Sequence, residues 1–188
     1  MNVSRLVLFV HIVGAIGIFA TLIVWLFGVG ALRRARRVEQ VRALASLIAR
    51  TSALAVGSIA LTGIAGIYLS LTFWNPTPAW TAVATVSFIA LAPIGAVQLE
   101  PRMRALAKQA EAEPDGPLPV PLQARAHDRL LALGVDVDIA LLLGILFLMV
   151  NKPPLAQAVA VMVIVLAGGI IVGLLPSVWR VRTASAAP

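Results

Sequence analysis

Residues 6–32 have the sequence LVLFVHIVGAIGIFATLIVWLFGVGAL, and RRARR follows directly at positions 33–37. A helix crosses the hydrocarbon core of a bilayer with roughly 20 mainly apolar residues, so this stretch is long enough to span a membrane. It is too long for the core of a signal peptide, and arginines follow it in place of a small-residue cleavage site. The stretch therefore predicts an anchored transmembrane helix.

Four more apolar stretches have the same character, at residues 51–74, 80–99, 130–150 and 155–175. Short proline-containing turns separate the second stretch from the third and the fourth from the fifth, which predicts two pairs of antiparallel neighbours. Residues 100–129 are polar and are predicted to form a cytoplasmic loop, helical at first and extended where prolines follow. The chain is thus predicted to be one all-α membrane domain over residues 1–188, a polytopic bundle of about five transmembrane helices.

The composition agrees with a membrane protein. Sixty per cent of the residues are hydrophobic and only 12% are charged, and the mean hydropathy is +0.97. A water-soluble surface carries more charge than this, so the surrounding solvent is predicted to be a lipid bilayer. The net charge of +7 does not indicate nucleic-acid binding, because most arginines lie beside the apolar stretches.

Other function classes are excluded by what the sequence lacks. The chain has no cysteine, which rules out disulfides, iron–sulfur clusters and thiolate metal sites. It has no Ser-His-Asp grouping, no phosphate-binding glycine loop and no zinc-ligand spacing. No enzymatic site of the kind found in soluble proteins is therefore predicted.

The basic residues predict the orientation. If residues 33–50 are cytoplasmic, thirteen of the fifteen lysines and arginines lie on the cytoplasmic side, as the positive-inside rule requires. Only Arg5 and Lys152 then lie outside. The N-terminus is predicted to be outside and the C-terminus cytoplasmic, in a multi-pass protein of a bacterial inner (plasma) membrane. The thirteen inner residues are Arg33, Arg34, Arg36, Arg37, Arg42, Arg50, Arg102, Arg104, Lys108, Arg125, Arg129, Arg180 and Arg182.

His11 is the first candidate for chemistry, because an ionisable side chain within a span is rare and marks a functional site by default. A neutral imidazole is a common ligand of haem iron and of metal ions. Met149 and Met162 are predicted to lie at a similar depth, so an imidazole–thioether site for haem b or copper is conceivable. Alternatively, His11 hydrogen-bonds to a neighbouring helix while the methionines pack.

Asp136 and Asp138 are the other ionisable groups within a span. They are two residues apart, hence about 200° apart around a helix, and cannot both face one site. Three alternatives are open for one of them: it binds a proton or cation during transport, it forms an intramembrane ion pair with Arg50, which enters the second span at the same inner depth, or it reaches solvent at the cytoplasmic side.

Two short segments resemble a known group. The run Leu8-Phe9-Val10-His11-Ile12-Val13-Gly14-Ala15 is similar to the first helix of small uncharacterised bacterial integral membrane proteins, and Met149-Val150-Asn151-Lys152-Pro153 resembles their Met-x-x-Lys-Pro segment. That group is related to copper-resistance protein D-like proteins and, distantly, to the bacterial membrane protoporphyrinogen oxidase. The resemblance implies a helical bundle of four or five spans with His11 as the candidate functional residue, associated with haem in the oxidase and with metal uptake in the copper proteins.

Three hypotheses for the function follow. The first is a small membrane bundle without catalytic activity that holds haem or copper at His11. The second is a transporter of a metal or another small solute that uses Asp136 or Asp138. The third is an accessory subunit that packs in a homo-oligomer or in a larger membrane complex.

Overall fold

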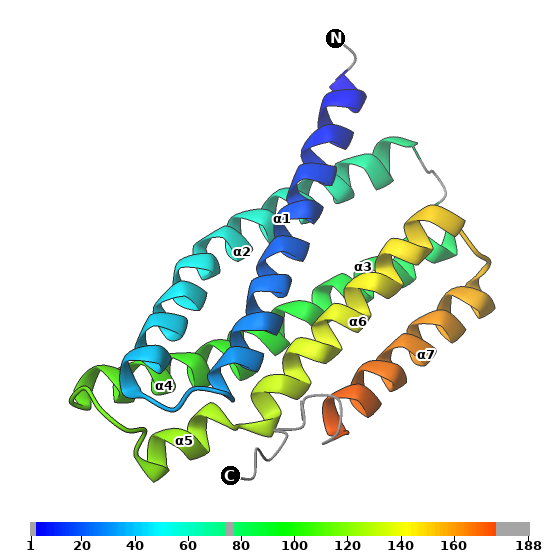
Figure 1. Ribbon diagram of the computed structural model, residues 1–188. Helices are drawn as coiled ribbons and strands as arrows, with labels where there is room; N and C mark the ends of the chain where they lie inside the picture. Colours follow the sequence, from blue (N-terminus) through cyan, green and yellow to red (C-terminus); the bar gives the residue numbers. More distant parts are fainter. Residues whose placement is uncertain (1–2, 74–76, 176–188) are drawn as a thin grey trace, which may run out of the picture.

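The structure is a computed structural model that describes residues 3–73 and 77–175 (Figure 1). Five of its helical segments are long and apolar enough to cross a membrane, which confirms the predicted all-helical bundle. The described elements are α1 (Val3–Leu32), α2 (Val38–Phe73), α3 (Ala79–Pro93), the π-helix η1 (Ile94–Leu99), α4 (Glu100–Ala112), α5 (Val120–Ala126), α6 (Arg129–Asn151) and α7 (Leu155–Leu174). The turn residues Asn75 and Pro76 and the basic residues Arg180 and Arg182 lie outside the described residues.

Helix α2 is longer than the predicted span of residues 51–74, because residues 38–50 belong to the same helix. Its 36 residues are about 54 Å long at 1.5 Å per residue, well above the ~30 Å hydrocarbon core. Because Glu39 and Arg42 lie in the first turns of α2 and charged side chains are costly in hydrocarbon, we expect these turns to extend beyond the membrane. This end of the bundle, which carries residues 33–37, is here called the basic end. Val38, Val41, Ala45 and Ile48 are buried there at helical spacing.

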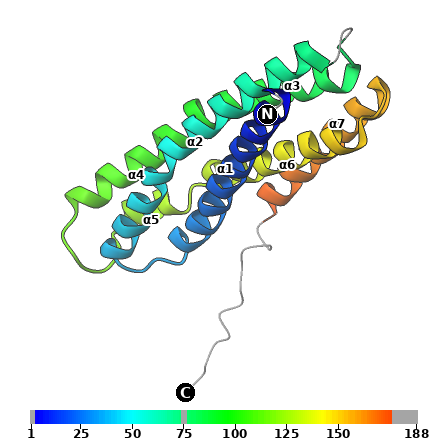
Figure 2. The same cartoon turned by 90° about the horizontal axis from the view of Figure 1, so that it is seen from above.

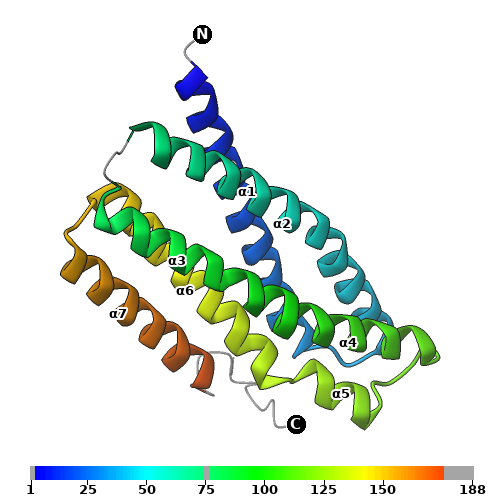
Figure 3. The same cartoon turned by 180° about the vertical axis from the view of Figure 1, so that it is seen from behind.

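Helices α3 and α4 form one continuous rod through η1, which Figure 3 shows from behind. The sequence predicts a kink at Pro93, and the structure has a π-helix over the next six residues. The proline has no N–H to donate to the previous turn. The amide of Ile94 donates to Leu91 O, and the amide of Glu100 donates across a wider turn to Gly95 O. The wider turn of the π-helix thus accommodates the missing N–H donor of Pro93, and the rod does not change direction sharply.

Residues 120–126 differ from the prediction of an extended proline-rich segment, because they form the short helix α5. Pro119 occupies the cap position with extended backbone angles, and Pro121 lies within the first turn, where its missing N–H breaks no helical bond. Leu122 is completely buried and holds α5 against the rest of the basic end.

The helices pack in two layers (Figure 2), with α2 and the α3–α4 rod on one side and α1, α6 and α7 on the other. Two apolar clusters fill the space between the helices. The basic-end cluster includes Trp25, Val29, Leu32, Ile48, Leu99, Met103, Leu106, Leu122, Leu131 and Val135. The far-end cluster includes Ile18, Leu22, Trp80, Ala84, Leu91, Leu141, Leu142, Ile145, Leu148 and Met162.

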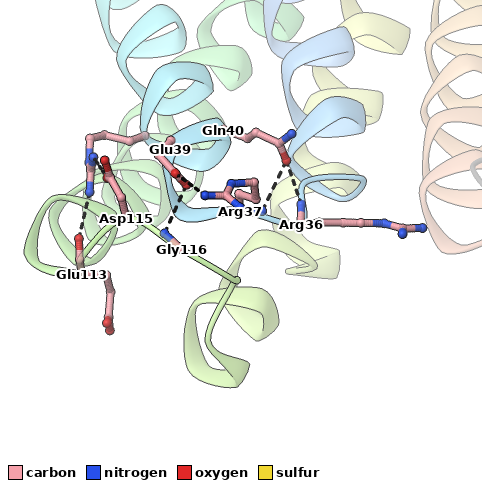
Figure 4. Close-up of polar contacts among 8 residues, drawn as sticks. Arg36, Arg37, Glu39, Gln40, Glu113, Asp115 and Gly116 are labelled. Carbon is pink, nitrogen blue, oxygen red and sulfur yellow. Dashed lines mark hydrogen bonds and ion pairs between the residues drawn. The ribbon is translucent and has the colours of Figure 1, made fainter.

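A set of polar contacts, here called the clasp, ties the α1–α2 connection to the segment between α4 and α5 (Figure 4). Val38 N donates to Gly116 O at 3.0 Å, and Leu118 N donates to Arg36 O at 2.9 Å. The side chain of Gln40 accepts hydrogen bonds from the amides of Arg36 and Arg37. Segments about 80 residues apart in the sequence are thereby joined by backbone as well as side-chain hydrogen bonds.

Two charged side chains complete the clasp. The guanidinium of Arg37 donates to Glu39 Oε1 at 2.8 Å, and this hydrogen bond lowers the pKa of Glu39, which lies on the part of α2 beyond the membrane. Arg42 donates to Ala110 O at 3.2 Å, to Glu113 O at 2.8 Å and to Asp115 Oδ1 at 2.7 Å. Arg42 therefore satisfies carbonyl groups at the end of α4 that no helical amide can reach.

Candidate functional site

Helix α6 carries both acidic candidates, and its first turn is held by an aspartate. Asp128 Oδ1 accepts a hydrogen bond from Leu130 N at 2.9 Å, which caps the helix, and its other carboxylate oxygen pairs with Arg102 at 3.1 Å. From this fixed start the helix runs through the middle of the bundle. Asp136 is 9% exposed and Asp138 is 4% exposed, so both carboxyl groups lie away from water.

Asp138 lies on the core face of α6. Residues three, four and seven positions away share its side of the helix, and Leu131, Val135, Leu142 and Ile145 at these positions are all buried. The Oδ1 atom of Asp138 is itself buried and has no hydrogen-bond partner among the described residues. A buried polar atom without a partner costs about 1–3 kcal/mol, which makes this carboxyl group a specific feature that requires a reason.

The position of Asp138 along the bundle coincides with a gap between the two apolar clusters. On α6 the basic-end cluster stops at Val135 and the far-end cluster begins at Leu141. Ile139 and Ile94 are the residues that pack against both clusters, and Ile94 is the first residue of the π-helix. A π-helix within an α-helix is often found at a functional site. The irregular backbone of the rod and the unpartnered carboxyl group thus occur at the same level.

Asp136 faces another side of α6, toward α7 and α1. Gly173 and Gly169 let α7 approach closely: a Cβ added at Gly173 would lie 3.3 Å from Asp136 Oδ2, and one at Gly169 would lie 3.1 Å from the Asp136 carbonyl. Beside this contact an open groove of about 400 Å³ runs along α6, between α1 and α7. Asp136 is the one ionisable residue in its wall, which is otherwise formed by Leu26, Ile139, Ala140, Leu143, Val165, Gly168, Gly169 and Val172.

Arg33 is the cation nearest to this carboxylate. Arg33 and Asp136 line a small cavity of about 10 Å³ between α1 and α6, enough for about one water molecule. The guanidinium donates a long 3.5 Å hydrogen bond to Asp128 O. Its Nε atom is buried without a partner in the described structure. Arg33 therefore faces Asp136 across the cavity without forming a direct ion pair with it.

The predicted partner of the aspartates, Arg50, lies elsewhere. The four ion pairs among the described residues are Arg37–Glu39, Arg42–Asp115, Arg102–Asp128 and Arg104–Glu100. Arg50 is exposed on α2, and α2 packs against α1 and α4 while α6 packs against α1, α3 and α7. The structure thus does not bring Arg50 together with Asp136 or Asp138, because α1 and the rod lie between their helices.

His11 lies on the face of α1 that contacts α2. Its Nδ1 donates a hydrogen bond to Thr62 O at 2.9 Å, since a carbonyl can only accept. The imidazole ring rests on Gly66, where a Cβ would lie 3.1 Å from Cε1 of the ring. Nδ1 carries the proton in this tautomer, so Nε2 has the lone pair that could bind a metal.

The two methionines belong to a different part of the bundle. Met162 packs against Gly144 of α6 in the far-end cluster, and Met149 packs at the edge of the same cluster. The contacts described for His11 are with α2 instead. Moreover, no group of three or more His, Asp or Glu side chains in residues 3–73 and 77–175 could hold a metal ion.

In a comparison with family models, residues 5–153 match the model described as "Predicted integral membrane protein (DUF2269)". The chain belongs to this family. Neither the comparison with curated proteins nor the comparison with solved structures gave a match. Membership in DUF2269 agrees with the five apolar helices and with contact to lipid. The relation to the copper-resistance and oxidase groups stays a prediction from the resemblance.

Sequence reasoning missed two parts of the site in this DUF2269 protein. Arg33 counts toward the positive-inside bias, and nothing in the sequence separates it from the neighbouring arginines that are exposed. The groove depends on the crossing of α1, α6 and α7, which a sequence without contacts does not specify. The sequence signal for the groove is the adjacent pair Gly168–Gly169, because two glycines in an apolar helix indicate either close contact with a neighbouring helix or open space beside the helix.

Proposed function

We propose that the protein is a small-solute transporter in which Asp138 binds a proton or a small cation and Asp136 serves as a second carboxylate nearer the basic end. The single observation that supports this most is the burial of both carboxyl groups inside the bundle without an ion pair among the described residues. Ionisable residues within membrane-spanning helices are rare and mark ion and proton pathways.

The energetics of burial favour a switch at Asp138. An unpaired carboxylate in a low-dielectric interior is destabilised by several kcal/mol, and binding a proton or a cation removes this penalty. The charged and neutral forms therefore favour different packing around the residue. The two apolar clusters on either side of Asp138 meet at Ile94 and Ile139, which pack against both, so this level is where we expect one part of the bundle to shift against the other.

Infrared difference spectroscopy tests the binding step directly. The purified protein in lipid is moved between acidic and alkaline buffer, and the carbonyl stretching band of a protonated carboxyl group is recorded. We expect a band that disappears in Asp138→Asn and persists in Asp115→Asn, a matched change at an exposed aspartate. An unchanged difference spectrum in Asp138→Asn would refute proton or cation binding by this residue.

The hydrogen bond of His11 favours a second candidate function, the binding of haem or copper. Ligating histidines commonly donate their other ring N–H to a carbonyl, which fixes the ring and its tautomer, and Thr62 O accepts such a bond here. Haem or copper bound at Nε2 would supply redox chemistry, while α2 would orient the imidazole. A Soret band or stoichiometric copper in the purified protein, lost in His11→Ala, would support this function, and the absence of both would exclude it.

A further inference from the structure

The groove between α1, α6 and α7 exposes apolar surface only. Its wall on α6 extends from Asp136 to Leu143, which is about 10 Å along the helix at 1.5 Å per residue. Leu143 and Val172 in the wall are exposed, so the groove opens to the outside of the bundle. Figure 1 shows α6 running between α1 and α7. Transmembrane helices and acyl chains both run close to the bilayer normal, so a chain can lie along this hollow of about 400 Å³.

Glycines on α7 create the groove. A Cβ at Gly169 would lie 2.7 Å from Ala140 Cβ, so α7 packs directly on α6 at this point. A Cβ at the neighbouring Gly168 would meet no atom within 4 Å, which leaves open space beside the contact. Water finds no polar partner on such a surface and does not occupy it. Within a bilayer the hollow is therefore filled by hydrocarbon, and an acyl chain in it contacts three helices instead of one.

Arg129 lies in line with the groove on α6. It precedes Asp136 by seven residues and Leu143 by fourteen, so the three positions share one side of the helix. Arg129 is exposed in the first turn of α6, at the basic end, and belongs to none of the four ion pairs of the described residues. Arginine side chains near a helix end extend toward the membrane surface, where lipid phosphates lie. Its guanidinium group is therefore available to a headgroup at the basic end of the groove.

Arg33 lies in line with the groove on α1. It follows Leu26 of the groove wall by seven residues, and its amide still donates to Val29 O, which places it on the last turn of the helix. The side chain reaches α6, because Nη2 is 3.5 Å from the carbonyl oxygen of Asp128, the residue before Arg129. Arginines from two helices thus lie at the basic end of the groove.

Nearby carboxylates do not neutralise this positive charge. Asp128 caps α6 and is paired with Arg102 at 3.1 Å. Asp136 lies across the small cavity from Arg33, and none of the described ion pairs joins the two. A guanidinium group binds a phosphate through two parallel hydrogen bonds, which makes arginine well suited to phosphate recognition. An anion with an apolar tail therefore satisfies the arginines and the groove together.

We propose that the groove, together with Arg33 and Arg129, binds one anionic phospholipid such as phosphatidylglycerol, with an acyl chain in the groove and the phosphate at the two guanidinium groups. Basic pockets between transmembrane helices on the cytoplasmic side of a membrane bind anionic headgroups. The lipid is a bound ligand of the bundle, so this inference is independent of the proposed transport function and of its infrared test at Asp138.

Native mass spectrometry of the purified, delipidated protein tests this by titration with phosphatidylglycerol and, separately, with phosphatidylcholine of the same acyl chains. The first phosphatidylglycerol is expected to bind about twenty-five-fold more tightly than phosphatidylcholine, because each arginine near the headgroup contributes about fivefold. Arg33→Gln and Arg129→Gln are each expected to lower this preference about fivefold, and the double variant is expected to abolish it. Arg50→Gln removes the same charge from an exposed position on α2 and is the matched control, expected to keep the preference.

Two further variants separate the groove from the charge and the charge from the fold. Gly168→Phe fills the open space with both arginines intact and is expected to weaken binding of phosphatidylglycerol severalfold, because the acyl chain loses its contacts in the groove. Gly57→Phe on α2, where a Cβ also meets nothing within 4 Å, is its control and is expected to bind normally. Arg129→Lys keeps the charge and is expected to retain most of the preference.

Several outcomes would overturn the inference. Equal affinity of the wild type for the two lipids would do so, as would an unchanged preference in the double variant, because other basic residues would then hold the headgroup. Unchanged binding in Gly168→Phe would mean that the headgroup binds without the groove. Glycerol 3-phosphate at a matched concentration is expected not to displace the lipid, and displacement would instead indicate a site for free phosphate esters.

Discussion

Replacing Arg42 with alanine is expected to destabilise the basic end of the bundle more than any other single change to an arginine of the clasp. Arg42 is the residue that reaches from α2 to the end of α4, where it bonds to Ala110 O, Glu113 O and Asp115. The truncated side chain leaves the two carbonyl groups without this donor and removes the ion pair.

The magnitude follows from the exposure of each contact. A hydrogen bond from a charged donor contributes about 1.5–3 kcal/mol when it is sheltered, and both carbonyl contacts are only partly buried, so roughly half of that applies to each. The ion pair with Asp115, whose side chain is 65% exposed, contributes about 0–1 kcal/mol. Together these contacts predict a loss of about 1.5–4 kcal/mol in the free energy of unfolding.

Unfolding by denaturant in mild detergent, followed by circular dichroism, measures this loss. Arg104→Ala is the matched control, because Arg104 is 78% exposed and pairs within one helix with Glu100, for which about 0.3–0.5 kcal/mol is typical. Arg42→Lys is expected to fall between the two, since an ammonium group cannot span three acceptors in the same geometry. If Arg42→Ala unfolds within 0.5 kcal/mol of Arg104→Ala, roughly the limit of such measurements, the clasp does not stabilise the fold in this way.

Three shorter predictions concern packing and pH. Gly14→Val is expected to destabilise the protein by about 1–3 kcal/mol, because its Cβ would lie within 3.0 Å of α2 backbone atoms, whereas Gly57→Val, with open space, is expected to have little effect in the same unfolding assay. Leu122→Ala is expected to lose about 2–5 kcal/mol because the side chain is completely buried; a loss below that of an exposed leucine would contradict the role of α5. The pKa of Glu39 is lowered, first by its hydrogen bond from Arg37. Its contribution to stability is therefore present above the ordinary pKa of 4.5 and is lost as the pH falls through the lower pKa of the folded state. Unfolding measured as a function of pH should show this loss for wild type and not for Glu39→Gln.

The sequence predicts the helices well because the pattern that defines them is local. Each span needs only an unbroken apolar stretch of sufficient length, which residues 6–32 provide without reference to any other part of the chain. The start of α2 at residues 38–50 is harder to predict, because it is stabilised by Val41 and Ile48 packing into a cluster made with α1, η1, α4, α5 and α6. Periodicity at one end of a span does not say whether the helix stops at the membrane surface.

The candidate site was only partly predictable for a related reason. The depth of His11, Asp136 and Asp138 follows from counting residues along a span, and the structure places both aspartates inside the bundle. The partner of a buried charge depends instead on which helices are neighbours. Arg50 and Asp136 were predicted to have matching depths, but α2 does not pack against α6. Arg33 at the end of α1 lines the small cavity beside Asp136 instead, without a direct ion pair to it.

The clasp has a mechanical consequence for the whole molecule. It fixes the basic end, where α1, α2, α4, α5 and the start of α6 meet in one cluster, while the opposite ends of α1 and α2 diverge from α6 and α7 (Figure 1). Because the helices are held together at the basic end and diverge at the other end, their thermal fluctuations should grow with distance from Arg42. Hydrogen exchange should then be slowest in the amides near residues 38–48 and faster toward the residues that follow Thr62.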